Sequence, residues 1–583
     1  MFANWKWPGV GLLTLLVLGA TLAAPLFAAA GGGGIVITSI GPDTRDTAKA
    51  SFVDLAGNIV VAGFTDGPNS AGDYAVLRFK PDGTLDPTFG NGGKVVTQVT
   101  NGGRHVDRAT AAMDQSTGRI VVAGITLVYE GGWVQGNEGD FSMVRYDVLG
   151  NVDKTFGSKG AVLTDLFGDR DEASAMVVQQ DDKIVQAGSS ITPGGRDFAL
   201  VRYTANGQLD TTFGAGGVVA TDMGFAKGDY PVRAASQTIE GEERIVVLGT
   251  VYDGVDSLIA LARYTSDGTL DPTFGAAGTG IVITPDFLGK RDGEPNAVAV
   301  DALGNIFVAA TIAEAPDTAK MNMAVVKYLP NGEMDPSFGE GGVARANVII
   351  GTLYPEHPEY YGNGECWAVA LQPDGKIVVA GSGGYYFTEL FVARFNPDGS
   401  LDDSFGAGGI AVTPFATSCD ARSVVVLNDG RIVVSGHTTL DAWRRLIVVV
   451  CYRPDGTLDP DFGPPPAPAG ISVTPTSGLV TTESGGTASF TVVLNSRPTD
   501  DVFIPVASSK PTEGTVSVSS LTFTPDNWYT AQTVTITGVE DTARDGDQPY
   551  AITLGPAWSD DPAYDDRDPA DASVTNKDNK KKK

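Results

Sequence analysis

A Phe-Gly pair recurs seven times along this chain, each time at the end of the same pattern of residues. The clearest copy contains Pro373-Asp-Gly-Lys-Ile-Val-Val-Ala-Gly381, then Phe391-Val-Ala-Arg-Phe395, and then Pro397-Asp-Gly-Ser-Leu-Asp-Asp-Ser-Phe-Gly406. The seven Phe residues, at spacings of 57 to 67 residues, are Phe89, Phe156, Phe213, Phe274, Phe338, Phe405 and Phe462. Such a period predicts a repeat protein in which each unit is one supersecondary structure packed against its neighbours.

Each unit offers four short segments with the features of β-strands. A small-residue segment such as Ala48–Ala50 precedes a β-branched run such as Ile59–Ala62, and a Val-x-Arg-aromatic segment and a Gly-x-Val-x-Thr segment follow. Their alternation and their Val and Ile content favour strands, while Asp-Gly and Asn-Gly pairs favour tight turns. Four-stranded units arranged around an axis are the blades of a β-propeller, where small residues suit the crowded inner strands. An open solenoid is the alternative.

The two ends of the array predict how a ring would close. The seventh unit ends at Phe462-Gly463 and continues into Pro464, so it lacks a fourth strand. The spare segment Gly33–Thr38 resembles Gly278–Thr284, which ends the fourth unit. Because an open ring leaves blade edges exposed, we expect the N-terminal strand to complete the last blade. The chain is therefore predicted to be all-β, with a seven-bladed β-propeller over residues 31–463.

The repeat motifs resemble those of the delta-60 repeat family of bacterial exported proteins. Units of that family combine Asp-Gly-Lys-Ile-Val-Val-Ala-Gly with Arg-Tyr and with Asp-Gly-x-Leu-Asp-x-x-Phe-Gly, and the resemblance covers about residues 34–463. It implies a propeller-like repeat array. It implies no activity, because the role of the family is not established.

The N-terminus and the net charge restrict where the protein works and what it binds. Residues 1–30 contain Lys6, an apolar run from Val10 to Phe27 and a small-residue end, which is the pattern of a secretory signal peptide. An uncleaved anchor is the alternative, and no later segment is long and apolar enough to span a bilayer. We expect a bacterial protein that is secreted or lies at the cell surface. A net charge of −29 argues against nucleic-acid partners, so the expected partner is an unknown protein or a glycan.

A second, smaller unit follows the repeats. The Pro-rich segment 464–470 has the composition of a stiff linker, and residues 471–576 contain alternating segments divided by turns, which predicts a small antiparallel β-sandwich. Residues 577–583 are a Lys-rich tail. Over about residues 470–576 the chain resembles the Calx-β family, through Glu483-Ser-Gly-Gly-Thr-Ala-Ser-Phe, Pro525-Asp-Asn-Trp-Tyr, Val534-Thr-Ile-Thr-Gly-Val-Glu-Asp541 and Asp545-Gly-Asp547.

The Calx-β resemblance implies a Ca²⁺ site at one end of the sandwich. Domains of that family often bind Ca²⁺ through acidic residues from separate loops, and Ca²⁺ takes oxygen ligands. The alternative is a solvated acidic rim, since the nearby Lys-rich tail would repel a cation. The matching residues are Glu483, Asp541, Asp545, Asp547 and Asp578.

Residues that commonly carry catalysis do not form a recognisable constellation. His105, His357 and His437 occupy unlike places in their units, and the sequence has no Gly-x-Ser-x-Gly elbow or His-Glu-x-x-His helix. We therefore predict no catalytic residues and an exported non-enzymatic scaffold or adhesion protein. The alternative is a secreted propeller lectin, hydrolase or lyase that binds its ligand at an acidic channel mouth. An enzyme should gather non-repeated polar residues at one place.

The most regular polar residues are a cation before an aromatic residue and an acid in the following turn. We expect each pair to brace its unit by a charge-assisted bond, and a ring of ligand contacts is the alternative. The seventh unit has Cys451 in place of the cation. The cations are Arg78, Arg145, Arg202, Arg263, Lys327 and Arg394, and the acids are Asp86, Asp153, Asp210, Asp271, Asp335, Asp402 and Asp459.

Other acids lie just before the first strands of the units. If they lie on the loops that enter the inner strands, one mouth of the channel is acidic and could hold a cation; solvated loops are the alternative. Cys366 and Cys419 share this region in adjacent units, which leaves a disulfide open. Asp46, Asp107 and Asp171 hold one register, and Glu172, Glu294, Glu365 and Asp420 stand next to it.

Overall fold

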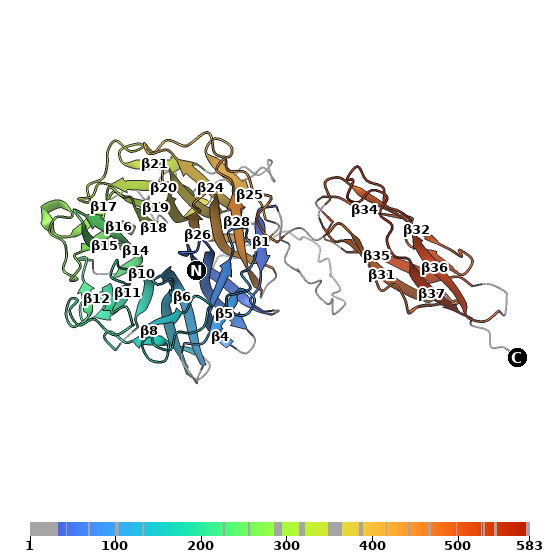
Figure 1. Ribbon diagram of the computed structural model, residues 1–583, viewed down its shortest axis with the longest axis horizontal. Coiled ribbons are helices and arrows are strands. Elements are labelled where there is room, and N and C mark those ends of the chain that lie inside the picture. The colour runs from blue at the N-terminus through green and yellow to red at the C-terminus, as the bar shows by residue number, and fades with distance from the viewer. Residues whose placement is uncertain are drawn as a thin grey trace, which may run out of the picture.

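The computed structural model describes residues 33–578, apart from 42, 68–69, 100–103, 131–132, 169, 226–227, 253, 255–256, 285–293, 314–320, 348–363, 384–388, 416, 441–443, 465–467, 497, 526, 529–530 and 541–544. The predicted signal peptide, His357 and Asp541 lie outside the described residues. In the described part of the chain the elements are β-strands apart from one 3-10 turn, η1 (Ala276–Gly278). Among the described residues, no helix has the length and apolar character needed to cross a membrane. Figure 1 looks along the axis of a ring of sheets, with further sheets beside it.

The ring is built from antiparallel sheets whose strands follow one another in chain order. Five of these sheets in the described chain have four strands each. They are β6 (Arg104–Asp114), β7 (Ile120–Glu130), β8 (Trp133–Tyr146) and β9 (Ala161–Thr164); β10 (Glu172–Val178), β11 (Ile184–Thr192), β12 (Gly195–Tyr203) and β13 (Val218–Thr221); β14 (Asp229–Ile239), β15 (Glu242–Tyr252), β16 (Ser257–Tyr264) and β17 (Ile281–Thr284); β18 (Glu294–Val300), β19 (Ile306–Ala313), β20 (Met321–Tyr328) and β21 (Val343–Ala346); β22 (Gly364–Leu371), β23 (Ile377–Gly383), β24 (Glu389–Phe395) and β25 (Ile410–Thr413).

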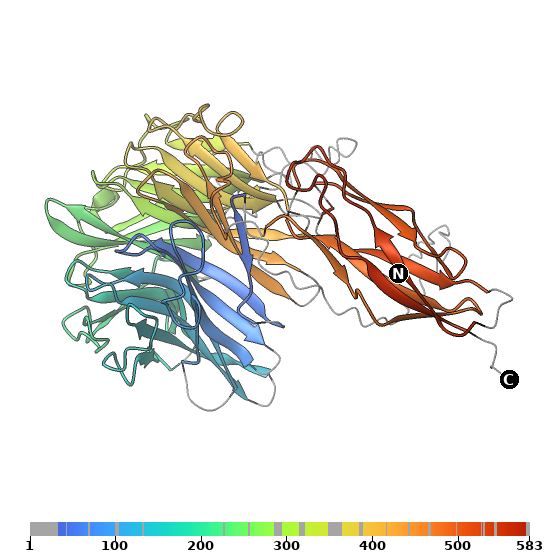
Figure 2. The same ribbon diagram turned by 45° about the vertical axis from the view of Figure 1, so that its right-hand side comes forward.

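An eight-stranded sheet joins the two ends of the array. One part holds β2 (Arg45–Val53), β3 (Ile59–Gly67), β4 (Ser70–Phe79) and β5 (Lys94–Thr97), and the other holds β26 (Cys419–Val426), β27 (Ile432–Thr439), β28 (Arg445–Tyr452) and β1 (Ile35–Thr38). The two parts meet at a single parallel pair, Arg45 with Arg445. Strand β1 runs antiparallel to β28, with Ile35 opposite Val450. In Figure 2 the blue first strand lies beside the orange strands, so the chain closes through the pairing that its ends predict.

Apolar cores lie between neighbouring sheets of the ring. Leu248 of β15 and Leu261 of β16 pack with Val308 of β19, and Phe274 of a repeated Phe-Gly pair is buried in the same cluster. All seven repeat Phe side chains are buried. Because burying such a side chain stabilises the fold by roughly 1.5–3 kcal/mol, each repeat Phe helps to hold two sheets together.

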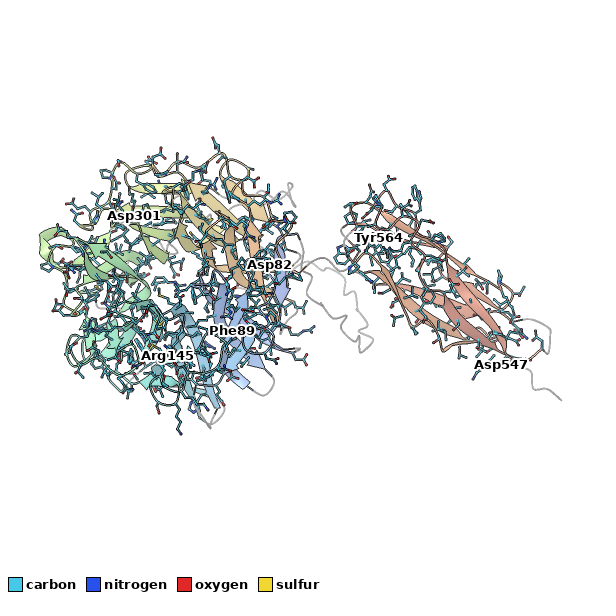
Figure 3. All side chains as sticks on the ribbon, viewed as in Figure 1. Asp82, Phe89, Arg145, Asp301, Asp547 and Tyr564 are labelled. Carbon is cyan, nitrogen blue, oxygen red and sulfur yellow. The ribbon has the colours of Figure 1, made fainter. Side chains whose placement is uncertain are left out.

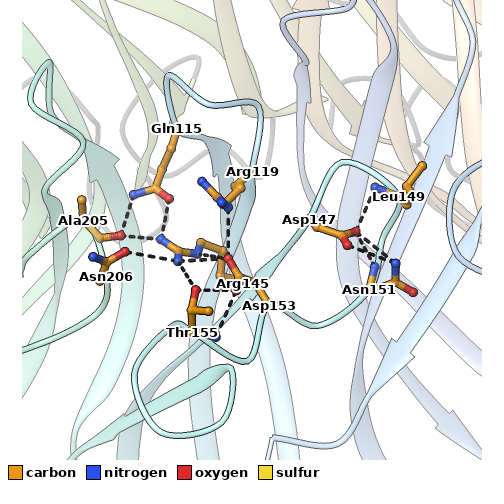
Figure 4. Close-up of polar contacts among 10 residues, drawn as sticks. All are labelled: Gln115, Arg119, Arg145, Asp147, Leu149, Asn151, Asp153, Thr155, Ala205 and Asn206. Atoms are coloured by element: carbon orange, nitrogen blue, oxygen red, sulfur yellow. Dashed lines mark hydrogen bonds and ion pairs between the residues drawn. The ribbon is translucent and has the colours of Figure 1, made fainter.

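The repeated cation and acid brace the units, as predicted, and Figure 4 shows one example. The Nε of Arg145 donates to Asp153 at 3.0 Å, and its Nη1 donates to Gln115 at 3.1 Å. The same Nη1 donates to the backbone carbonyl of Ala205, which belongs to the next sheet. The guanidinium carbon lies 4.7 Å from the centroid of the Phe156 ring. One arginine therefore ties a turn, a repeat Phe and a neighbouring sheet.

Four other units keep the arginine and its acid, and Lys327 takes the place of the arginine beside Asp335 at 2.9 Å. In the last unit, where Cys451 replaces the cation, Asp459 pairs instead with Arg431 at 3.1 Å. Carbonyls of the following sheet that accept from the bracing arginines are those of Val148, Ala205, Ser266, Pro330 and Pro454. The repeated cations and acids are therefore structural, as predicted. The alternative, a ring of ligand contacts, has no support because these pairs are buried.

The C-terminal residues form two sheets around one apolar core. Its buried members include Phe490, Ile536, Ile552 and Tyr564. Figure 3 places Tyr564 and Asp547 at opposite ends of these sheets. One sheet has the order β29 (Ile471–Thr474), β31 (Thr487–Leu494), β35 (Gln532–Gly538) and β33 (Gly514–Val516), and the other has β30 (Leu479–Thr482), β37 (Ala572–Lys577), β36 (Gln548–Leu554), β32 (Val502–Ser508) and β34 (Ser520–Phe523).

Candidate functional site in the axial channel

Each inner strand of the ring carries a register shift at the same place, where one extra residue breaks the pairing with the second strand. In β2, for example, Ala48 pairs with Gly63 and Ala50 pairs with Ala62, which leaves Lys49 unpaired. Such a β-bulge re-aims a side chain. The seven bulge residues, one from each inner strand, are Lys49, Thr110, Ser174, Val232, Asn296, Trp367 and Arg422.

The glycine of the Ile-Val-Val-Ala-Gly motif makes this bulge sterically feasible. A Cβ at Gly63 would lie 1.8 Å from the carbonyl oxygen of Thr47, and one at Gly436 would lie 1.9 Å from that of Asp420. Both glycines pair with the residue before the bulge. A glycine inside a strand pattern is a known sign of a bulge or of a close backbone approach. This glycine is therefore a sequence signal, unused in the predictions above, that locates the channel residues.

The bulge residues differ from unit to unit, and most of them line one axial cavity. Its volume is about 240 Å³, and its walls include Lys49, Thr110, Ser174, Trp367 and Arg422. Strand β14 contributes Arg233, the neighbour of its bulge residue. Figure 1 shows several of these inner strands, β6, β10, β14 and β26, around the axis of the ring. Non-repeated polar residues thus converge at one place, which is the feature expected of an enzyme.

Three cations share the cavity and perturb one another. Burial lowers the pKa of the Lys49 ammonium to about 8, and repulsion from Arg422, Arg233 and Arg108 adds to the effect. Burial likewise lowers the pKa of Arg233 to about 10, with a further contribution from Arg422. A lysine whose pKa lies near 8 can act as a base at slightly alkaline pH, and the neighbouring guanidinium groups attract an anion.

Arg422 and Trp367 together form one wall of the cavity. The Arg422 guanidinium carbon lies 4.0 Å from the centroid of the Trp367 ring, which is a close cation–π contact. Within the described residues, the buried Nε of Arg422 and Nε1 of Trp367 have no hydrogen-bond partner. Buried donors without partners are costly, so these two N–H groups are suited to donate to a bound ligand.

A second ring of side chains lies two residues before the bulge, on the same face of each inner strand because side chains alternate. This ring contains Thr47, Arg108, Glu172, Tyr230, Glu294, Glu365 and Asp420. It includes the four predicted mouth acids that stand next to the Asp46 register. The mouth is therefore acidic along part of its rim, while the cavity beneath it is cationic.

The prediction that Asp46, Asp107 and Asp171 could line the mouth is wrong. A shift of one residue along a strand turns a side chain to the other face, so these aspartates are fully buried away from the axis. Asp46 accepts hydrogen bonds from the Ile40 N–H at 2.7 Å and from the Thr65 hydroxyl at 2.6 Å. They fasten the loop that enters the inner strand, and burial raises the pKa of each.

Two of the mouth acids differ in proton affinity. Burial raises the pKa of Glu365, and the neighbouring Asp420 and Glu294 charges add to this, against the opposing effect of Arg422. Burial also acts on Asp420, but a hydrogen bond from His437 and the charges of Arg422 and Arg445 hold its pKa below the usual range. The His437 Nε2 lies 3.2 Å from Asp420, and burial lowers the pKa of His437, so the imidazole is neutral and donates from Nε2. Of these two acids, Glu365 therefore holds a proton more readily than Asp420.

The remaining predicted residues lie elsewhere. Glu483, Asp545 and Asp578 come together at one end of the C-terminal sheets, with carboxylate oxygens within 4.8 Å of one another. Asp547 accepts a hydrogen bond from the Asp578 N–H at 3.2 Å. Cys366, Cys419 and Cys451 are buried, and no disulfide joins the first two.

Comparisons with known proteins agree with the ring of sheets. Six segments, residues 57–89, 115–156, 179–213, 244–274, 372–405 and 427–462, match the family model described as "Domain of unknown function (DUF5122) beta-propeller". No match was found among curated protein sequences.

Solved structures give a distant likeness. A polysaccharide lyase described as an ulvan lyase has 10% identity and a TM-score of 0.40, covering 74% of this chain and 96% of its own. The Dos1 propeller has 9% identity and a TM-score of 0.37, covering 72% and 95%. The GH93 α-L-arabinofuranosidase of Fusarium graminearum has 10% identity and a TM-score of 0.36, covering 73% and 98%.

The prediction of a non-enzymatic scaffold or adhesion protein is wrong. The axial cavity gathers non-repeated polar side chains, the feature expected of an enzyme, whereas a scaffold should show only the repeated ones. The chain is all-β and propeller-like, and six of its segments match a β-propeller repeat family of unknown function.

Proposed function

We propose that this protein is an exported enzyme that cleaves an acidic polysaccharide, holding an anionic sugar residue in the axial channel. The observation that carries the proposal is the convergence of Lys49, Arg233 and Arg422 in one cavity beside Trp367. Guanidinium groups match the geometry of carboxylates and sulfates, and an aromatic ring offers an apolar face to a sugar ring. Although the whole chain carries a charge of −29, salt screens that field over about 8–10 Å, so the local cations dominate inside the channel.

The size of the cavity favours one terminal residue over a long segment of chain. Pockets for drug-sized ligands span about 300–1,000 Å³, and this cavity measures 240 Å³. One charged sugar ring would fill it, and the rest of the polymer would leave through the mouth. The ring of Glu294, Glu365 and Asp420 then lies where the next glycosidic bond would be.

The chemistry we propose is β-elimination at a uronate residue. Arg233 and Arg422 neutralise the carboxylate, which acidifies the adjacent C5–H, and the Lys49 amine removes that proton. The electron pair forms the C4–C5 double bond as the C4–O bond breaks, and the Glu365 carboxyl group protonates the leaving oxygen. The raised pKa of Glu365 and the lowered pKa of Lys49 suit these two roles.

Exposing the full chain to uronate-containing polysaccharides tests this function. The expected product has an unsaturated terminal residue with ultraviolet absorbance, and its rate of formation should follow a bell-shaped pH profile, because the reaction needs Lys49 without its proton and Glu365 with its own. Lys49→Met should lower kcat by roughly 10²–10⁴-fold, since that is the contribution of a general base. The matched control, Lys80→Met in an exposed turn, should keep full activity.

A neutral polymer cleaved as fast as an acidic one would contradict the proposal, as would an active Lys49→Met variant. Hydrolysis to a saturated product would transfer the chemistry to the carboxylates Glu365 and Asp420, because glycosidases use a pair of such groups. Binding without cleavage would leave the protein a lectin for acidic glycans.

We also propose that the ring has seven blades. Dividing the eight-stranded sheet between β28 and β2 yields two four-stranded units, one completed by β1. Together with the five four-stranded sheets they correspond to the seven Phe-Gly repeats. The delta-60 and Calx-β relationships, and the domain limits 31–463 and 471–576, belong to this proposal.

A second proposed function is Ca²⁺ binding by the C-terminal sheets. Glu483 is 3% exposed, and its oxygen lies within 4.8 Å of oxygens of Asp545 and Asp578, which supports a cation between them. We expect the full chain to bind Ca²⁺ with a Kd of about 0.1–1 mM, as extracellular modules do, and Glu483→Gln to remove one bound ion. Asp500→Asn, an exposed change, serves as the control. Calorimetry that finds equal stoichiometry for Glu483→Gln and the unmodified chain would contradict this site.

A further inference from the structure

The buried aspartate that fastens each entering loop has a different environment in β14. In the first three units, one oxygen of this aspartate accepts a hydrogen bond from a hydroxyl group of the second strand. The pairs are Asp46 with Thr65, Asp107 with Thr126 and Asp171 with Ser190. At the fourth place, Asp229 pairs with Val251, which has no hydroxyl group. Its Oδ2 accepts from the Met223 N–H at 2.8 Å. Its Oδ1 is buried without a partner among the described residues, and the side chain is 0% exposed.

Two further carboxylates lie beside the Asp229 carboxylate. Asp197 of β12 and Asp222, just after β13, each place an oxygen so that the three atoms lie within 4.8 Å of one another. No described Lys, Arg or His forms an ion pair with Asp197, Asp222 or Asp229. Burial, followed by repulsion from Asp222 and Asp197, raises the pKa of Asp229 to about 6. Three acids at this spacing without a counter-charge are costly unless something positive joins them.

We propose that Asp197, Asp222 and Asp229 bind a Ca²⁺ ion at the junction of the β10–β13 and β14–β17 sheets. Ca²⁺–oxygen distances of about 2.4 Å allow two ligands of one ion to lie up to about 4.8 Å apart, which matches the spacing here. Mg²⁺ requires shorter distances of about 2.0–2.1 Å and near-ideal octahedral geometry, so it fits less well. The unpartnered Oδ1 of Asp229 supplies a ligand that no hydrogen bond competes for.

The ion would connect three segments that the backbone leaves separate. Asp197 belongs to the third strand of one sheet, Asp222 follows its fourth strand, and Asp229 begins the next sheet. Binding would therefore stabilise the junction between the two sheets and the loop that crosses it. This role is independent of the polysaccharide chemistry proposed for the channel.

The preceding junction offers a matched comparison within the same chain. Asp140, Asp165 and Asp171 form an equivalent triad, also within 4.8 Å. There, however, both oxygens of the buried Asp171 are already engaged, one by the Leu166 N–H and one by the Ser190 hydroxyl. The two triads have the same charge and differ in whether the buried carboxylate has a free oxygen.

Calcium titration of the full chain by calorimetry tests the site, in a Glu483→Gln background that removes the proposed C-terminal ion. We expect one ion to remain bound. Asp222→Asn, at an exposed position, should raise its Kd at least tenfold, whereas Asp165→Asn, the exposed residue of the matched triad, should leave the Kd unchanged. In a thermal-denaturation assay, Ca²⁺ should raise the Tm of the background chain and of Asp165→Asn, and should raise that of Asp222→Asn much less.

A second variant keeps the test independent of any folding defect. Val251→Thr restores the hydroxyl of the other sheets, so it should weaken Ca²⁺ binding while preserving or raising the Tm of the calcium-free protein. The proposal is overturned if the Glu483→Gln chain binds no Ca²⁺ at millimolar concentration. It is equally overturned if Asp222→Asn and Asp165→Asn bind Ca²⁺ alike.

Discussion

Replacing Asp271 with Asn should lower the free energy of unfolding by about 3–5 kcal/mol, the usual cost of leaving a buried charge without its partner. Asp271 is 2% exposed, and one of its oxygens lies 3.0 Å from Nε of both Arg263 and Arg244. Arg263 is also buried and stacks 4.5 Å from the centroid of the Phe274 ring. Without the carboxylate, two guanidinium groups face each other inside the turn. Urea denaturation followed by tryptophan fluorescence measures the change.

The loss of stability in Asp271→Asn should depend on pH. Burial opposes ionisation of Asp271, but hydrogen bonds from Thr273 and the charges of the arginines outweigh it and hold its pKa below the usual range. The carboxylate therefore contributes stability above the unfolded pKa of about 3.9, and this contribution disappears as the pH falls through the folded pKa. The difference between the unmodified chain and Asp271→Asn should thus shrink in acid. The control is Asp398→Asn in an exposed turn, and a loss as large as that of Asp271→Asn there would contradict the argument.

The second large effect is expected from Gly63→Ala. The new Cβ would lie 1.8 Å from the Thr47 carbonyl oxygen, a backbone atom that cannot turn aside as a side chain can. Relief requires the bulge to flatten, so we expect a loss of about 3 kcal/mol, at the upper end for overpacked sites. Flattening would also move Lys49 out of the cavity, so activity should fall further than stability alone would explain.

Gly194→Ala is the matched control, because its Cβ would meet nothing closer than 3.6 Å. One unit of the chain carries alanine at the position of Gly63, and its surroundings support the steric argument. This alanine is Ala310 of β19, and the residue that pairs with it is Pro295. At Gly249, opposite Pro231, the nearest backbone carbonyl oxygen would lie at 2.5 Å, farther than at Gly63. Equal stability of Gly63→Ala and the unmodified chain would show that the bulge does not need glycine.

The repeat architecture was predictable because it depends on local chemistry that recurs. The Phe-Gly pairs, the Asp-Gly turns and the Val and Ile runs each specify a short segment, and seven copies of the same segments specify a ring. The brace was also predictable, since the cation and the acid lie eight residues apart in one unit, as Arg145 and Asp153 do. Only its reach to the next sheet, through carbonyls such as that of Ala205, required the structure.

The candidate site was harder to predict because its members are far apart in the chain and differ from one another. Lys49, Arg233 and Arg422 come from three inner strands and share no motif. A search for repeated polar residues finds the braces, whereas the channel is lined by the residues that vary at one repeated position. The glycine that marks this position was visible in every clear copy of the motif.

The seven Phe-Gly repeats by themselves determined an all-β repeat array, because hydrophobic alternation and turn chemistry act within a few residues. The spare first strand and the incomplete last unit predicted how the array closes. Only the tertiary structure decided which side chains meet. A β-bulge turns one residue per inner strand toward the axis, whereas Asp46, three residues before Lys49, is buried on the other face. The packing of neighbouring sheets brings Asp197 of one sheet to Asp229 of the next. The way the strands pack around the axis therefore determines which charged side chains meet in the channel and at the sheet junction.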